Sequence, residues 1–140
     1  DLNHKMDTLQ AIILNEKLKN LKRIIYKRIK NAKLYDQKLN KNIKKPFFSQ
    51  NGEHIYYTYT IMTKNRDKLK KFLKKNQIET KIQHPIIISQ HPGLKNIYNK
   101  DKDFPNGKKI VKSILSIPVH EKLSSKQINF VINKINYFTK

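Results

Sequence analysis

Between Met6 and Asn40 the apolar residues recur every three or four positions, and neither proline nor glycine interrupts them. Lysine and asparagine fill many of the other positions. This spacing predicts helix, either as one long helix or as two nearly continuous ones. The apolar register slips near Arg28-Ile29, where we expect a bend or a change of packing partner. The apolar positions are Leu14, Leu18, Leu21, Ile25, Ile29, Ala32, Tyr35 and Leu39.

The start of this helix is marked by Asn3 and Asp7, whose side chains suit the N-terminal cap of a helix. The run Ala11–Leu14 follows and places apolar side chains on every side. A helix that is apolar all round is normally buried, so we expect its first two turns to be covered. Without a covering body the run would be left bare, which favours aggregation.

The remainder of the chain alternates short strands and helices, read from β-branched and aromatic runs, proline and capping signals. The predicted elements are a strand over 54–63, a helix from Asn65, a strand over 78–83, a loop over 84–104, a helix from Pro105, an extended piece over 116–120 and a helix after the Ser124–Gln127 capping box. The helix from Pro105 is expected to carry Ile110, Val111, Ile114 and Leu115 inward. This order predicts an α+β fold with helices packed on a small antiparallel sheet.

The formal net charge of +21 raises the possibility of a nucleic-acid partner. However, the chain has 28 lysines and only three arginines, and the lysines occur in every segment. Arginine is the residue that binds phosphates and bases with two parallel hydrogen bonds. The composition therefore favours solvated lysines and an AT-rich coding sequence, and a basic α+β nucleic-acid-binding module remains the alternative.

Other compositional features exclude some classes of protein. The chain has no cysteine, so a disulfide framework and a thiolate metal site are excluded. Its five histidines show no His-x3-His spacing, and no metal site is expected. No apolar stretch approaches the length of a membrane span. We expect a cytoplasmic protein with no membrane partner.

Several ordered motifs resemble the C-terminal part of the DegT/DnrJ/EryC1/StrS family of PLP-dependent sugar aminotransferases. The first is N-H-K-M-D-T-L-Q-A-I-I-L over 3–14. The others are R-I-K-N-A-K-L-Y over 28–35, H-I-Y-Y-T-Y-T-I over 54–61, I-E-T with Q-H-P over 78–85, F-P at 104–105 and L-S-I-P-V-H over 115–120. The chain departs from the family pattern at Lys5 (often Arg), at Asn76-Gln77 (no glycine) and at Gln83-His84 (often His-Tyr).

This resemblance implies the small C-terminal domain of a fold-type I enzyme. Residues 1–42 would form a helix that bridges from an upstream large domain, and 43–140 would form the small domain. The large domain would hold pyridoxal 5'-phosphate on a lysine that this chain lacks, so the chain alone should be inactive. The full-length enzyme would transfer an amino group, from glutamate, to the keto group of a nucleotide-linked sugar for surface polysaccharide or related amino-sugar biosynthesis. Homodimers would share their active sites.

The resemblance also assigns candidate site residues. Asn3 matches an asparagine that reaches the PLP phosphate of the neighbouring subunit, with a plain helix cap as the alternative role. Lys5, Gln83 and His84 match positions near the nucleotide-sugar substrate; solvated or purely structural roles stay open for them. No catalytic residue is expected in this chain. PLP-dependent sugar dehydratases and cyclitol aminotransferases of the same family are the alternative activities.

Overall fold

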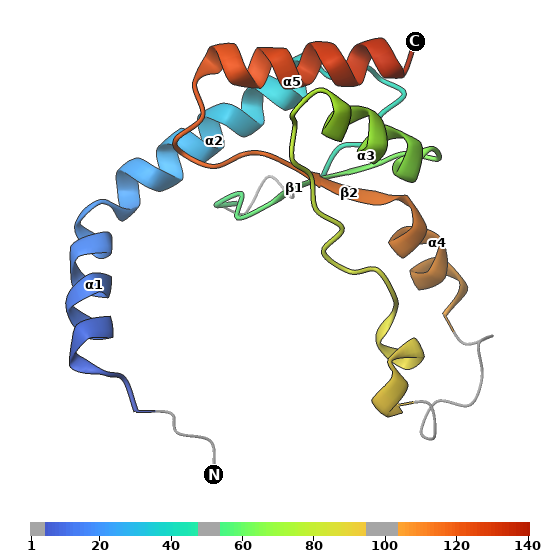
Figure 1. Cartoon of the computed structure of the whole chain (residues 1–140). Helices are drawn as coiled ribbons and strands as arrows, with labels where there is room; N and C mark the ends of the chain where they lie inside the picture. Colours follow the sequence, from blue (N-terminus) through green and yellow to red (C-terminus); the bar gives the residue numbers. More distant parts are fainter. Residues whose placement is uncertain (1–4, 48–53, 95–103) are drawn as a thin grey trace.

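The computed structural model describes residues 5–47, 54–94 and 104–140. The elements are drawn in Figure 1. They are α1 (Thr8–Lys19), α2 (Leu21–Lys38), β1 (Tyr59–Met62), α3 (Arg66–Lys75), the short 3-10 turns η1 (Ile88–Gln90) and η2 (Pro92–Leu94), α4 (Pro105–Ser113), β2 (Ile114–Ile117) and α5 (Ser125–Phe138). The α+β prediction, with helices on a small antiparallel sheet, is confirmed.

The first helical region consists of two nearly continuous helices divided at Asn20, which is one of the two predicted forms. Helix α2 continues without a break through Arg28-Ile29, where a bend was one of the two expectations. Asn20 ends α1 with its backbone N–H donating to the carbonyls of Lys17 and Leu18. Its side-chain oxygen also accepts from Arg23 Nη2 at 3.3 Å. Asn20 has φ −100° and ψ −1°, away from regular helical values, so the helix is interrupted at this position.

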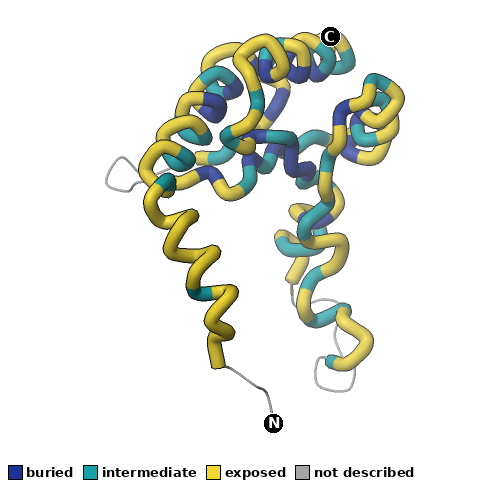
Figure 2. The backbone as a smooth tube through the Cα atoms, turned by 60° about the vertical axis from the view of Figure 1, so that its left-hand side comes forward, coloured by how far each residue is buried: buried dark blue, intermediate teal, exposed yellow. Residues whose placement is uncertain are grey.

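The predicted start of α1 is confirmed at Asp7, but its predicted burial is wrong in this chain. Asp7 accepts from the backbone of Leu9, and a capping box links it to Gln10. No residue of α1 is buried, and Figure 2 shows the helix as exposed along almost its whole length. Ile12, Ile13 and Leu14 are all exposed, so the apolar run is left bare in this chain.

The sheet consists of β1 and β2, which pair antiparallel with Tyr59 opposite Ile117 and Met62 opposite Ile114. Single bridges extend it on both sides, from Lys44 to Met62 and from Lys81 to Ser116. The predicted strand over 54–63 is therefore too long, since β1 spans Tyr59–Met62. The prediction of a strand over 78–83 is wrong, because this segment makes only the single bridge at Lys81.

Backbone conformation explains why the first strand is short. Tyr56 has a φ of 49°, which lies in the left-handed region and is incompatible with continuous strand pairing. Ile114 and Leu115 were expected in the helix that starts at Pro105. They belong instead to β2, because α4 ends at Ser113.

Three helices cover the sheet and form one core with it. Helix α5 contacts both α2 and α3, and the three lie together above the strands in Figure 1. The Ser124–Gln127 capping box of α5 is confirmed. The largest completely buried side chains of this core are Tyr35, Tyr59, Ile61, Leu69, Leu73, Leu115, Ile128 and Ile135.

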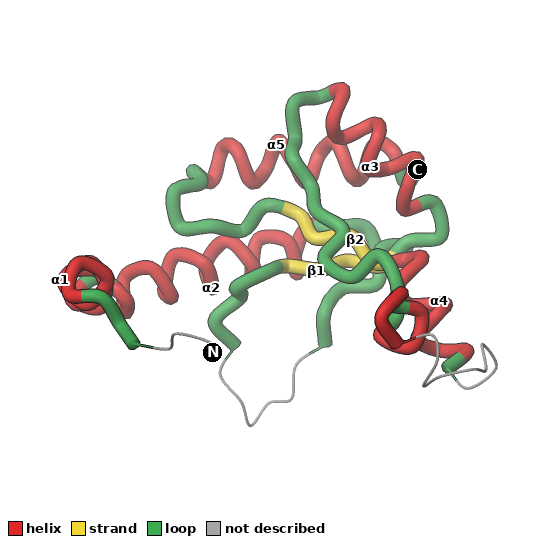
Figure 3. Tube along the Cα trace, turned by 60° about the horizontal axis from the view of Figure 1, so that its bottom comes forward, coloured by secondary structure: helices red, strands yellow, loops and turns green. Residues whose placement is uncertain are grey.

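Two arms extend from the same side of this body, as Figures 1 and 2 show. The first arm is α1. The second arm consists of the loop over 84–94 and α4. Seen from below in Figure 3, α1 and α4 lie on opposite sides of the strands. Within the described ranges, no helix is long and apolar enough to cross a membrane.

The backbone after α3 explains why the family pattern has a glycine at a point where this chain has none. Gln77 follows the helix with a φ of 59°, and Ile78 N donates to Leu73 O at 2.9 Å. This left-handed position after a helix favours glycine. We expect Gln77→Gly to raise the free energy of unfolding by about 0.5–1 kcal/mol, measured by urea denaturation followed by circular dichroism.

The matched control is Gln37→Gly within α2, where glycine should lower the free energy of unfolding by about 1 kcal/mol. Equal destabilisation by both substitutions would contradict the expectation for Gln77.

Candidate functional site

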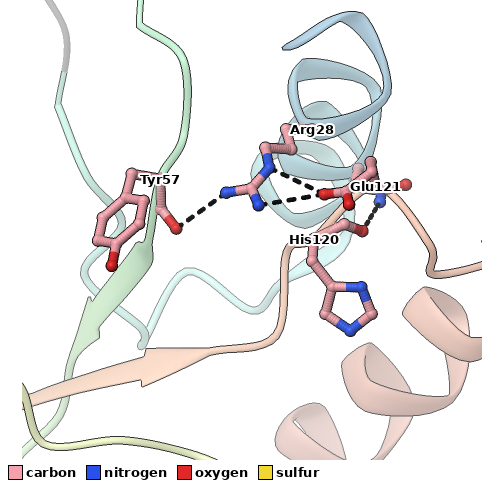
Figure 4. Close-up of polar contacts among 5 residues, drawn as sticks. Arg28, Tyr57, His120 and Glu121 are labelled. Carbon is pink, nitrogen blue, oxygen red and sulfur yellow. Dashed lines mark hydrogen bonds and ion pairs between the residues drawn. The ribbon is translucent and has the colours of Figure 1, made fainter. Parts of the chain in front are cut away.

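Helix α2 is fixed to the chain beyond β2 by a charged contact, shown in Figure 4. Arg28 Nε donates to Glu121 Oε2 at 3.2 Å, and Arg28 Nη2 lies 3.1 Å from the same oxygen. Arg28 Nη1 donates to the Tyr57 carbonyl at 3.3 Å. One guanidinium thus joins α2, the segment before β1 and the segment after β2.

Two further side chains of α2 bond to the same segment. Asn31 Nδ2 donates to the His120 carbonyl at 3.0 Å, and the Tyr35 hydroxyl donates to the Pro118 carbonyl at 2.6 Å. Burial raises the pKa of the Tyr35 hydroxyl, so it remains a proton donor. The motifs over 28–35 and 115–120 are therefore in contact, although 83 residues separate Tyr35 from Pro118.

The Arg28–Glu121 contact should make stability depend on pH. A hydrogen bond to its own backbone and the neighbouring Arg28 hold the pKa of the Glu121 carboxyl below its ordinary value, against the opposing effect of burial. A lowered folded-state pKa means stabilisation above the unfolded-state pKa, which is lost as the pH falls through the folded-state value. We expect Glu121→Gln to cost about 1–2 kcal/mol at pH 7.

The measurement is urea denaturation of both proteins between pH 7 and pH 3, in which the difference should shrink as the pH falls. Glu16→Gln serves as the control, because the Glu16–Lys19 pair is exposed on α1 and should contribute little at any pH. A difference that persists unchanged at low pH would contradict the expectation.

A polar groove of about 660 Å³ runs beside this contact. Its wall includes Arg28, Tyr57, His120 and Gln83. Gln83 is half-buried. The groove thus gathers residues from four separate motifs, those over 28–35, 54–61, 78–85 and 115–120.

An apolar hollow of about 670 Å³ lies in the second arm, and His84 is at its wall. His84 is exposed, and most of the other lining residues are apolar. Gly107 lies close to the opposite wall, since a Cβ at this position would meet Ile87 Cγ2 at 3.2 Å. The lining residues are His84, Ile86, Ile87, Ile88, Ser89, Phe104, Pro105, Asn106, Gly107 and Val111.

The candidate site residues are not gathered in one place. Gln83 and His84 are adjacent in sequence but line two different depressions. Lys5 is exposed and precedes α1, so it lies on the other arm. Asn3 falls outside the described residues. The assignment of all four to cofactor or substrate therefore stays a prediction.

None of the lysines among the described residues is buried, whereas a lysine that forms a Schiff base is usually desolvated. The Tyr59 hydroxyl donates a hydrogen bond to Asp36 Oδ1 at 2.5 Å. Burial and this hydrogen bond raise the pKa of Tyr59. Among the described residues, no group of three acidic or histidine side chains could hold a metal ion.

The contacts of Arg28, Asn31 and Tyr35 were not predicted from the sequence. Their spacing of three and four residues places them on one face of α2. The motif identified them as a set, but periodicity contains no information on which distant segment this face would meet.

The chain is similar to longer proteins over nearly all of its length. A relative from Geobacillus stearothermophilus, described as a pleiotropic regulatory protein, is 30% identical over 97% of this chain and 38% of its own length. The UDP-2-acetamido-2-deoxy-3-oxo-D-glucuronate aminotransferase of Pseudomonas aeruginosa is 30% identical over 93% of this chain and 36% of its own length.

The fold is similar to that of DesV from S. venezuelae, solved in complex with a ketimine intermediate. The TM-score is 0.93 at 22% identity, over 97% of this chain and 37% of that one. The chain thus spans little more than a third of the proteins it matches. A sequence model of the DegT/DnrJ/EryC1/StrS aminotransferase family matches residues 2–136, so this chain belongs to that family.

Proposed function

We propose that this chain is the C-terminal part of a PLP-dependent aminotransferase that transfers an amino group from glutamate to the keto group of a nucleotide-linked sugar. The observation that carries the proposal is the family match over 2–136. The name of the Pseudomonas aeruginosa relative, an aminotransferase of a UDP-linked oxo sugar, supports the substrate class. A role in surface polysaccharide or related amino-sugar synthesis and a cytoplasmic location belong to the same proposal.

In this proposal the cofactor is held mainly by the remainder of the protein. PLP would supply the electron sink for amino transfer. This chain would contribute Asn3 toward the phosphate of PLP in the neighbouring subunit of a homodimer. Residues 1–42 would connect to the large domain, and the small domain over 43–140 would carry the substrate-facing loop.

The test is to read the coding DNA upstream of Asp1 and to express the complete protein. We expect a large domain with a Schiff-base lysine and a yellow PLP chromophore. Incubation with glutamate and UDP- or dTDP-linked keto-sugars should yield an amino sugar by mass spectrometry, with equimolar 2-oxoglutarate. A colourless protein that forms no amino sugar would overturn the proposal. Dehydration without amino transfer would identify the dehydratase alternative, and amination of a cyclitol the other.

The proposed substrate contacts can be tested on the complete protein. We expect Gln83→Ala and His84→Ala each to lower kcat/KM for the nucleotide sugar by about 10-fold or more, mainly through KM, because each would remove a hydrogen bond made on substrate binding. Steady-state kinetics with the sugar as the varied substrate measures this.

The control is His91→Ala, an exposed histidine that is not among the residues lining the polar groove or the apolar hollow, and it should leave kcat/KM within about twofold. If His84→Ala matches this control, His84 is a structural residue of the loop.

A basic nucleic-acid-binding module is the alternative from another class, and the net charge of +21 favours it. Specific binding of that kind would weaken steeply as salt is raised. Filter binding at two salt concentrations, with duplex DNA and an RNA, distinguishes it. Binding that is weak and indifferent to sequence would leave the aminotransferase proposal in place.

A further inference from the structure

The outward surfaces of α3 and α5 form a positively charged face above the strands, whereas both arms extend below them (Figure 1). The two helices contact each other, and the rings of Phe72 and Tyr137 stack between them with their centroids 6.2 Å apart. The side of α3 opposite the buried Leu69 and Leu73 consists of lysines. These exposed lysines, spaced by four, three and four residues, are Lys64, Lys68, Lys71 and Lys75.

The outward surface of α5 has the same spacing and adds aromatic rings to the lysines. Its exposed residues are Lys126, Phe130, Asn133 and Tyr137. Phe130 is 47% exposed and Tyr137 69%. The ammonium group of Lys134 lies 5.3 Å from the centre of the Phe130 ring, so a cation and a ring are presented together. Two large aromatic side chains therefore face water on a helix whose other side is in the core.

Acidic residues are nearly absent from these two helices. Helix α3 contains five lysines and one acidic residue, Asp67, whereas α5 contains two lysines and no acidic residue. Asp67 Oδ1 lies 2.8 Å from Arg66 Nε, so its charge is largely balanced. The number of lysines would not by itself distinguish this face, because lysine occurs in every segment. The distinguishing feature is the combination of lysines, exposed aromatic rings and a single, paired carboxylate.

This combination fits the surface of an anionic lipid bilayer. Lysines near such a surface are attracted by its negative potential without a directional requirement, and aromatic rings favour the level of the lipid headgroups. A nucleic acid favours arginine, which binds phosphate with two hydrogen bonds, yet the one arginine of these helices, Arg66, is buried and donates to the carbonyls of Val111 and Ile114. A protein partner fits less well, because lysine is depleted at protein–protein interfaces.

We propose that the outward face of α3 and α5 binds anionic phospholipids at a membrane surface. The contact is peripheral, with the lysines at the phosphates and the rings of Phe130 and Tyr137 among the headgroups. This differs from the expectation of no membrane partner, which came from the lack of a spanning stretch; a peripheral contact needs none. The proposal does not depend on the proposed function, because this face contains none of the candidate site residues.

Co-sedimentation of the complete protein with lipid vesicles tests the proposal. We expect binding to vesicles of equal parts phosphatidylglycerol and phosphatidylcholine, which weakens as salt is raised, and no binding to vesicles of phosphatidylcholine alone. Replacing Lys68 and Lys71 together by glutamine should weaken the binding by about 10-fold or more, since each lysine near an anionic surface contributes about 5-fold. The matched control replaces Lys30 and Lys33, which are also exposed and three residues apart but lie on α2; it should weaken binding by less than about threefold.

A second pair of variants tests the aromatic part of the face. Tyr137→Ser should weaken binding to the anionic vesicles by about threefold or more, because it removes a ring from the headgroup level. Tyr26→Ser is the control, since Tyr26 is 67% exposed, close to the 69% of Tyr137, but lies on α2; it should leave binding unchanged. Thermal melts followed by circular dichroism establish that both variants are folded.

Three results would overturn the proposal. The first is no binding to the anionic vesicles. The second is an equal loss from the Lys68–Lys71 pair and the Lys30–Lys33 pair, which would indicate attraction to the net charge of the whole protein. The third is binding to duplex DNA or RNA in preference to vesicles, weakened by the Lys68–Lys71 replacement, which would identify a nucleic-acid surface instead.

Vesicle binding requires no substrate and no cofactor, so it is separable from the proposed function. A complete protein that binds anionic vesicles through this face but forms no amino sugar would lose the proposed function and keep the membrane contact. One that forms the amino sugar without binding vesicles would lose the membrane contact alone. The Lys68–Lys71 replacement should leave kcat/KM for a soluble nucleotide sugar unchanged.

Discussion

Replacing Ile135 by alanine is expected to lower the free energy of unfolding of this chain by about 2–5 kcal/mol, the largest effect of any substitution considered for the core. Ile135 is completely buried on α5, in the core that α2, α3 and the sheet share. Truncation removes buried apolar surface and leaves a cavity that these rigid elements cannot fill. Equilibrium urea denaturation followed by circular dichroism measures the loss.

Ile12→Ala on α1 is the matched control, because it makes the same chemical change where the side chain is 59% exposed. It should change the free energy of unfolding of this chain by less than about 0.5 kcal/mol. Similar losses for both variants would mean that the core is not organised around α5.

Replacing Arg66 by methionine is expected to cost about 2–4 kcal/mol. Arg66 is buried at the start of α3, and its Nη1 donates to the carbonyls of Val111 at 3.1 Å and Ile114 at 3.3 Å. Its Nε lies 2.8 Å from Asp67 Oδ1 without the geometry of a hydrogen bond, so that contact is electrostatic. Methionine preserves the packing of the stem but leaves the last carbonyls of α4 without this cation, which also interacts favourably with the helix dipole.

Arg23→Met provides the comparison. Arg23 is exposed and bonds only to the Asn20 side chain among the contacts described for it, so its loss should fall within about 0.5 kcal/mol. A small effect at Arg66 would show that water replaces the guanidinium at the end of α4. Faster hydrogen exchange confined to the amides of α4 in the Arg66 variant would identify the carbonyls as the cause.

Local chemistry was enough to predict most of the helices. Asp7 and Ser124 were identified as cap residues, and the structure begins α1 and α5 directly after them. Pro105 likewise opens α4. These signals depend on side chains that bond within one helical turn, so they can be read without knowing the rest of the fold.

The strands and the bend could not be predicted equally well, because they depend on distant partners. The run over 78–83 has the residue types of a strand, yet it pairs with β2 through Lys81 alone. The residue types show only that this run could form a strand, whereas strand pairing also requires a neighbouring strand of matching length. The bend was expected from the apolar register, whereas the helical region is divided at Asn20, where the backbone departs from helical values.

The candidate site was predicted from resemblance and only partly from residue chemistry. Gln83 and His84 could be named as a pair, but their division between the polar groove and the apolar hollow depends on the path of the chain after Lys81. The burial of α1 was predicted from the apolar run Ala11–Leu14. Among the described residues, no segment buries that run.

The contacts of α2 also have a consequence for the order in which the chain folds. Arg28, Asn31 and Tyr35 bond to residues 83–93 positions later, and α2 also packs on α5, which ends at Phe138. Contacts between such distant positions form slowly, because a long loop must close first. During synthesis α2 leaves the ribosome long before its partners exist, so the body can close only after the last helix emerges. A nascent chain arrested before Ser124 should therefore remain open and accessible to proteases and chaperones.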